Sequence, residues 1–121
     1  MKIATNIQQS KKLAEILPLK SADMYYPYFG DDDYGTTPRV GEGIEFSGGK
    51  DIPAWSLGAL LNLLPEAINE YTKFFALLQI SKNGICYHHP FGYLIKGFFE
   101  EETLIDAAFE MVCWLKENKH I

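Results

Sequence analysis

The sequence is poor in arginine and cysteine, and it has no hydrophobic run long enough to span a membrane. Arg39 is the only arginine, and the formal net charge is −5. Because clustered Lys and Arg side chains dominate affinity for phosphate backbones, we expect no binding to nucleic acid. The apolar runs fall well short of the roughly 20 residues that a membrane helix needs, so we expect no membrane association either.

The scarcity of cysteine also limits the cross-links and metal sites available to the chain. Cys86 and Cys113 lie in different predicted elements and have no C-x-x-C spacing. This pattern indicates free thiols rather than a disulfide framework or a zinc site. The N-terminal residues MKIATN turn polar at once and lack the apolar core of a secretory signal. We therefore expect a cytoplasmic protein.

The size and composition favour a folded chain. It has 121 residues, of which 47% are apolar and 14% aromatic, enough for one domain with a core of its own. We predict a single α+β domain over residues 1–121. A long irregular segment is expected at about 27–53, where Gly, Pro, Asp and Thr are frequent and only residues 44–46 alternate like an edge strand.

Capping residues and apolar spacing predict three helices. Thr5 and Gln8 form a capping box at the start of the first helix, over about residues 6–16. Ser56 caps the second, which is rich in leucine, and Thr103 caps the last helix of the chain.

A β-hairpin is predicted between the second and third helices. Asn83-Gly84 is a strong two-residue hairpin signal, because both central positions of a type I′ turn need positive φ. This turn pairs Lys82 with Ile85. The side chains on the same side of the hairpin as Ile85, among them Ile80, Tyr87 and Tyr93, are expected to face the core. A third strand over about residues 93–99 completes an antiparallel, hairpin-based sheet of two to four strands. N-terminal, central and C-terminal helices are expected to pack the sheet.

Three side chains of this hairpin form a candidate reactive cluster. Cys86 and His88, two residues apart on one strand, share a face with Gln79 on the other strand. A nearby imidazole lowers the pKa of a thiol, and this spacing suits two metal ligands. The cluster contains neither a complete catalytic set nor a complete ligand set, so the alternative is a partly exposed sheet face.

An acidic run lies at residues 31–33, which are three consecutive aspartates. Asp31, Asp33 and Glu42 fit positions one, three and twelve of a calcium loop. However, Thr36 occupies the position of the turning glycine, and Pro and Gly residues leave no room for flanking helices. We interpret the run as a solvent-exposed acidic loop.

Aromatic residues surround the acidic run. Tyrosines combine apolar area with a hydroxyl group at a small entropy cost, which makes exposed clusters good contact surfaces. The predicted interaction surface comprises Tyr25, Tyr26, Tyr28, Phe29, Asp31, Asp32, Asp33 and Tyr34.

The stretch AWSLG, residues 54–58, differs by one residue from the G-x-S-x-G motif of serine hydrolases. We expect no buried apolar strand before it, and the chain is too short for the sheet that uses this motif. We interpret Ser56 as a helix cap.

Three segments carry a resemblance to a known family: ADMY at residues 22–25, PAWSL at 53–57 and the helix core AAFEMVCWL at 107–115. In their order and spacing the chain resembles a family of short proteins encoded in bacteriophage and prophage-like regions. The aspartates match no family motif. The resemblance implies a phage-related cytoplasmic accessory protein and supplies no catalytic residue.

These observations together predict a non-catalytic protein-interaction module with an unidentified protein partner and no cofactor. The competing hypothesis is a small enzyme or a ligand- or metal-binding protein. It would use Gln79, Cys86 and His88, or the aspartates at 31–33.

Overall fold

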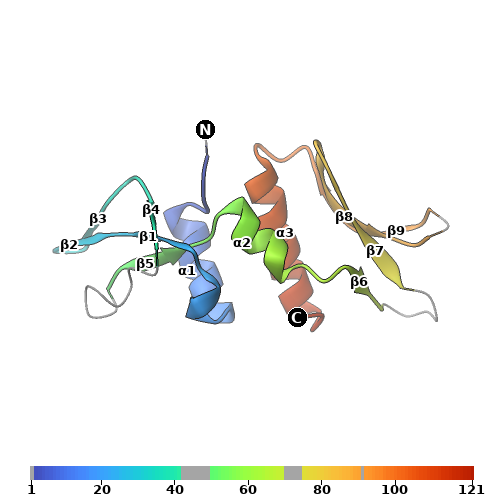
Figure 1. Cartoon of the computed structure of the whole chain (residues 1–121), viewed down its shortest axis with the longest axis horizontal. Helices are drawn as coiled ribbons and strands as arrows, with labels where there is room; N and C mark the ends of the chain where they lie inside the picture. The colour runs from blue at the N-terminus through green and yellow to red at the C-terminus, as the bar shows by residue number, and fades with distance from the viewer. Residues whose placement is uncertain (1, 42–49, 70–74, 91) are drawn as a thin grey trace. The chain divides into compact units, whose positions relative to one another are not determined.

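The computed structural model describes residues 2–41, 50–69, 75–90 and 92–121. Helices and antiparallel sheets of two to four strands make up these ranges, which confirms the predicted α+β class (Figure 1). The chain divides into two compact units, Met1–Ala59 and Leu60–Ile121. The single domain expected from the sequence stays a prediction. No helix in the described ranges has the length and apolar character needed to cross a bilayer.

The first unit begins with helix α1 (Ile7–Ile16), whose N-cap is Asn6. The Asn6 side chain accepts the Gln9 N–H at 2.8 Å, and the Gln9 side chain accepts the Asn6 N–H at 3.0 Å. This is the predicted capping box, moved one residue along the chain from Thr5 and Gln8. The prediction was wrong by that residue because Thr5 is fully buried and bonds to the interior instead.

The described residues of the first unit also contain five short strands and a 3-10 turn, η1 (Leu19–Ser21). The strands are β1 (Met24–Tyr26), β2 (Tyr28–Gly30), β3 (Asp33–Tyr34), β4 (Arg39–Val40) and β5 (Ile52–Ala54). β1 lies between β4 and β5 in one antiparallel sheet, and β2 pairs with β3 in a separate hairpin. The segment expected to be irregular, 27–53, thus contains strands in its described part. The edge strand expected at 44–46 lies outside the described residues.

Thr5 is the polar centre of this unit. Its N–H donates to the carbonyl of Trp55 at 2.9 Å, and its Oγ1 accepts the Trp55 N–H at 3.2 Å. Its carbonyl accepts the Tyr26 hydroxyl at 2.8 Å, and its Oγ1 lies 2.7 Å from the Ser10 Oγ. These bonds tie the N-terminal segment, α1, β1 and the end of β5 together around a buried core.

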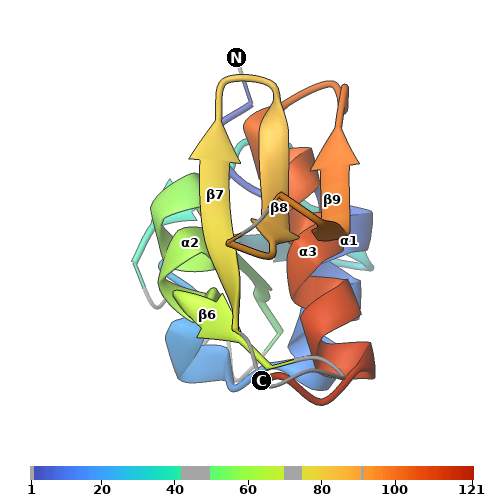
Figure 2. The same ribbon diagram turned by 90° about the vertical axis from the view of Figure 1, so that its right-hand side faces the viewer.

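The second unit contains a four-stranded antiparallel sheet with the order β6-β7-β8-β9. Its strands are β6 (Ala67–Ile68), β7 (Ala76–Ser81), β8 (Gly84–His88) and β9 (Leu94–Phe99). Helix α3 (Leu104–Glu117) packs on β8 and β9, and Figure 2 shows it behind the sheet. The predicted third strand and the Thr103 cap are confirmed, since Thr103 Oγ1 accepts the Asp106 N–H at 3.1 Å.

Helix α2 (Leu57–Leu63) contains the boundary between the two units. The Oγ of Ser56 accepts the Ala59 N–H at 3.2 Å and donates to the carboxylate of Asp23. The Asp23 carboxylate also accepts the Ser56 N–H at 2.9 Å. The interpretation of Ser56 as a helix cap is therefore confirmed. The expectation that no buried strand precedes it was wrong, since all three residues of β5 are buried.

The register of the β7–β8 hairpin differs from the prediction. Ser81 pairs with Gly84, so the turn residues are Lys82 and Asn83, and neither has positive φ. The reason is the neighbouring strand, because a Cβ on Gly84 would lie 2.2 Å from the carbonyl oxygen of Phe98. The glycine is needed inside β8, where β9 approaches closely, and not in the turn.

This change of register preserves the side to which each residue points. Tyr87 and Ile85 are fully buried on the side predicted to face the core, and the Tyr87 hydroxyl donates to the Pro65 carbonyl at 2.7 Å. Ile80 and Tyr93 were also predicted on the core side, and this is wrong, since they are 43% and 71% exposed. The core therefore covers only part of the side that was predicted to face it.

Candidate functional site

The three aspartates form the tip of the β2–β3 hairpin. Asp31 and Asp32 have φ of 49° and 60°, and Gly30 before them has φ of 102°. Gly30 pairs with Asp33, so the turn is a two-residue turn with positive φ at both central positions, as type I′ requires. Asp tolerates this conformation better than most residues with a side chain. The acidic run is therefore a tight hairpin turn.

The base of this hairpin is anchored by backbone and side-chain bonds. The Tyr28 N–H donates to Oδ1 of the buried Asp51 at 2.8 Å, and the Gly35 N–H donates to the Pro27 carbonyl at 2.9 Å. The Tyr28 and Tyr34 rings lie 5.3 Å apart across the strands. These contacts hold the hairpin base so that its tip projects in a defined direction.

Two lysines contact the tyrosine rings at the base. The Nζ of Lys50 lies 5.2 Å from the centre of the Tyr28 ring, and the Nζ of Lys11 lies 5.7 Å from that of Tyr34. Both distances suit cation–π attraction. The lysines thus pack on the rings, and the carboxylates of the tip form no ion pair or hydrogen bond with any other described residue.

Burial divides the predicted interaction surface. Phe29 is 59% exposed and the three aspartates are exposed, whereas Tyr25, Tyr28 and Tyr34 are half-buried. Tyr26 does not lie on the surface: it is buried, its hydroxyl bonds to Thr5, and burial raises the pKa of its phenol. The exposed part consists of Phe29, Asp31, Asp32 and Asp33, which we call the acidic tip.

The second predicted cluster is only partly assembled. Gln79 and Cys86 are cross-strand partners, whereas His88 pairs with Leu77. Cys86 is 6% exposed, and burial raises the pKa of its thiol. A nucleophilic cysteine needs a lowered pKa, so this thiol does not have the properties that the cluster was predicted to use.

The surroundings of Cys86 explain its burial. Gly97 is its partner on β9, and a Cβ on Gly97 would lie 2.3 Å from the Phe99 ring. The ring of Phe99 therefore lies over Gly97, beside Cys86. His88 turns its Nδ1 towards the His89 carbonyl oxygen, at 3.1 Å. Among the described residues there is no group of three or more His, Cys, Asp or Glu side chains that could hold a metal ion.

The hairpin turn at Asp31-Asp32 was missed from the sequence. Two aromatic residues, Tyr28 and Tyr34, flank it and pair across it, and Asp is one of the few residues that enter left-handed conformations readily. Paired aromatic residues on both sides of two aspartates were the sequence signal from which this hairpin turn could have been predicted.

Comparison of the chain with known proteins gave no match among family models, curated sequences or solved structures.

Proposed function

We propose that this protein is a non-catalytic interaction module, a phage-related accessory protein in the sense of the family it resembles. Its acidic tip, formed by Phe29 and Asp31–Asp33, contacts a basic surface of a protein partner. The proposal rests on one observation, which is that the three carboxylates of the tip are exposed and form no ion pair or hydrogen bond with any other described residue.

The turn itself needs residues that tolerate positive φ, and Asn-Gly or Asp-Gly would meet that need at lower cost. Asp31 and Asp32 meet it with two adjacent like charges, which repel each other. Together with Asp33 they form no ion pair with any described residue that could offset this repulsion. Local features that the fold does not require are found most often at functional sites.

Phe29 adds an apolar group next to these charges. It is 59% exposed on β2, one residue before the Gly30 that begins the turn. An exposed aromatic side chain beside charged groups is a typical anchor of a protein interface. The tip is therefore suited to a partner with basic side chains around an apolar pocket.

The test is capture of partners from lysate of cells that produce the protein, with the full chain as bait. The informative variant replaces Asp31, Asp32 and Asp33 by Asn, because Asn keeps the side-chain shape and tolerates the turn conformation. We expect the wild type to retain a stoichiometric partner and the variant to bind it at least about tenfold more weakly. Retention should also fall as salt is raised, because exposed charges are screened.

A matched control removes three negative charges elsewhere. Glu101, Glu102 and Glu117 are exposed in the second unit, and their replacement by Gln changes the net charge equally. This control should bind the partner like the wild type. If both variants lost binding to the partner equally, the effect would be one of net charge. If both retained the partner as the wild type does, the acidic tip would be excluded as the contact.

A further inference from the structure

Strand β9 is an outer strand of the four-stranded sheet. Among the strands of the described residues, in the order β6-β7-β8-β9, it pairs with β8 on one side only. Its sequence, Leu-Ile-Lys-Gly-Phe-Phe, is mostly apolar. An edge strand of this kind presents unpaired N–H and C=O groups that can pair with another strand. Natural edges are commonly protected by proline or by several charges, and β9 has no proline and a single charge, Lys96.

The backbone bonds show which residues of β9 face the open edge. The Glu100 N–H donates to the Asn83 carbonyl at 3.1 Å, so the main chain of Glu100 points towards β8. Main-chain groups alternate in direction along a strand, which turns those of Phe98 and Lys96 towards β8 as well. The N–H and C=O groups of Gly97 and Phe99 consequently point away from the sheet. The β8–β9 pairing has an irregularity between Tyr87 and His88, which lies outside the part of β9 that runs from Lys96 to Phe99.

We propose that the open edge of β9 pairs antiparallel with β9 of a second copy of this chain, about a two-fold axis at Phe98. Gly97 then opposes Phe99 of the second copy, and the outward main-chain groups of both residues meet. Lys96 lies across from Glu100 of the second copy, which directly follows the last strand residue, Phe99, and has φ of 61°. The same pair recurs on the other side of the axis. The interface uses the same residues from both copies, as two-fold symmetry requires.

Charge selects this register over its neighbours. Registers that bring together the outward main-chain groups of at least two residue pairs within β9 place the axis at Lys96, Gly97 or Phe98. An axis at Lys96 would set this lysine against itself, and an axis at Gly97 would set Glu100 against Leu94. An axis at Phe98 joins unlike charges, and Lys96 and Glu100 form no ion pair with other described residues in their own chain. Opposite charges facing each other across strands are favourable, and like charges are not.

The side chains at the edge fit the same arrangement. Phe99 is 44% exposed, and its ring already lies over Gly97 of its own chain. In the pair, its exposed side meets Gly97 of the second copy, which has no side chain to obstruct it. Lys96 holds its Nζ 5.0 Å from the centre of the Phe98 ring, which places it beside the axis.

The test is sedimentation equilibrium of the full chain over a range of concentrations, with two charge-reversal variants. We expect the wild type to approach twice the chain mass of 13.7 kDa as its concentration rises. Lys96→Glu and Glu100→Lys each place like charges together twice, so each alone should raise the dissociation constant about tenfold or more. An equimolar mixture of the two variants restores unlike pairs on both sides of the axis and should recover the dimer.

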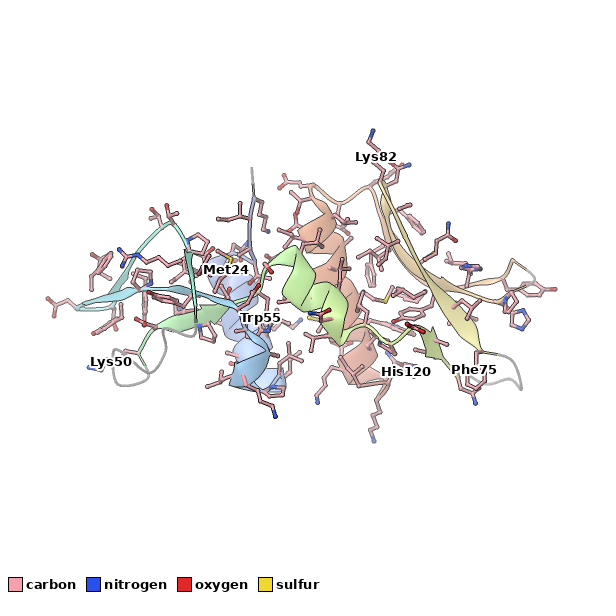
Figure 3. All side chains as sticks on the ribbon, in the orientation of Figure 1. Met24, Lys50, Trp55, Phe75, Lys82 and His120 are labelled. Carbon is pink, nitrogen blue, oxygen red and sulfur yellow. The ribbon has the colours of Figure 1, made fainter. Side chains whose placement is uncertain are left out.

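Lys82→Glu provides the control. Figure 3 shows Lys82 at the turn of the β7–β8 hairpin, where it is exposed. This turn lies on the β8 side of β9, opposite to the open edge, so the same charge change should leave association unaltered. Far-ultraviolet circular dichroism checks that each variant is folded before the sedimentation measurement. A wild type that keeps the chain mass at every concentration would overturn the proposal. The proposal would also be overturned if the mixture of the two variants dimerised as weakly as each variant alone. The same holds if Lys82→Glu weakened association as much as the substitutions on β9 do.

Discussion

The β2–β3 and β7–β8 hairpins of this protein have two-residue turns with different backbone conformations. In the β2–β3 hairpin, Asp31 and Asp32 occupy the central positions with positive φ. In the β7–β8 hairpin, Lys82 and Asn83 occupy the turn without positive φ, although Asn83-Gly84 next to it is the stronger hairpin signal. A turn signal therefore does not by itself locate a turn.

The neighbouring strand accounts for the difference. β2 and β3 form a separate two-stranded sheet, so the residues of the loop decide the geometry of their turn. β8 is flanked by β9, and only glycine fits at position 84 beneath the Phe98 carbonyl. A turn preference contributes about 1 kcal/mol, whereas overpacking against a rigid backbone costs up to about 3 kcal/mol. The packing term is larger and sets the register.

A substitution that introduces a side chain at this tightly packed position should have the largest effect on stability. Gly84→Ala places a Cβ against the Phe98 backbone, and we expect a loss of about 3 kcal/mol in the free energy of unfolding, measured by urea denaturation. Gly58→Ala is the control, because its Cβ would have only Ser56 Oγ, at 3.8 Å, as a neighbour. It should stabilise by up to about 0.5 kcal/mol. Similar losses in both variants would contradict the register.

High pH should act on the β7–β8 hairpin, which carries Cys86 and Tyr87. Burial raises the pKa of both groups, so the folded chain keeps protons that the unfolded chain loses. The stabilisation is complete below the unfolded pKa values, 9.0 for the thiol and 10.0 for the phenol, and falls as pH rises above them. Each group contributes a loss of about 1.4 kcal/mol per pH unit in that window.

Urea denaturation from pH 8 upwards measures this dependence. Tyr87→Phe loses the bond to the Pro65 carbonyl, so its stability should be lower at neutral pH, by about 1 kcal/mol. Its further decline above pH 10 should be shallower than that of the wild type, because one ionising group is gone. A decline of unchanged steepness would mean that Tyr87 does not contribute.

Glycine substitutions in the two turns should have small effects of opposite sign. Asp32→Gly relieves a residue with φ of 60° and should stabilise by about 0.5–1 kcal/mol. Asn83→Gly relieves no backbone strain, because Asn83 has no positive φ. It should destabilise the fold by about 0.5–1 kcal/mol, because glycine raises the conformational entropy of the unfolded chain. Thermal denaturation of both variants measures the difference.

Asp32→Asn is the control for the first substitution, since it removes the charge and keeps the side chain. It separates relief of backbone strain from relief of like-charge repulsion. If Asn83→Gly were to stabilise as much as Asp32→Gly, the two turns would share one conformation, against the register found here.

The sequence alone predicted the features that depend on neighbouring residues. Ser56 and Thr103 cap helices because the side-chain oxygen and the N–H that it bonds lie within one turn of chain. The third strand and the α+β class follow from apolar spacing over a few residues. The acidic tip was found as a charged, exposed group, although its hairpin turn was not recognised.

The tertiary structure decided what depends on residues far apart in the chain. Tyr26 is buried because its hydroxyl meets Thr5, and Thr5 leaves the capping position to Asn6 because Trp55 and Ser10 bond to it. Gly84 belongs to a strand because the Phe98 carbonyl lies over it. No local propensity encodes these contacts, because each depends on where a distant segment of backbone comes to lie.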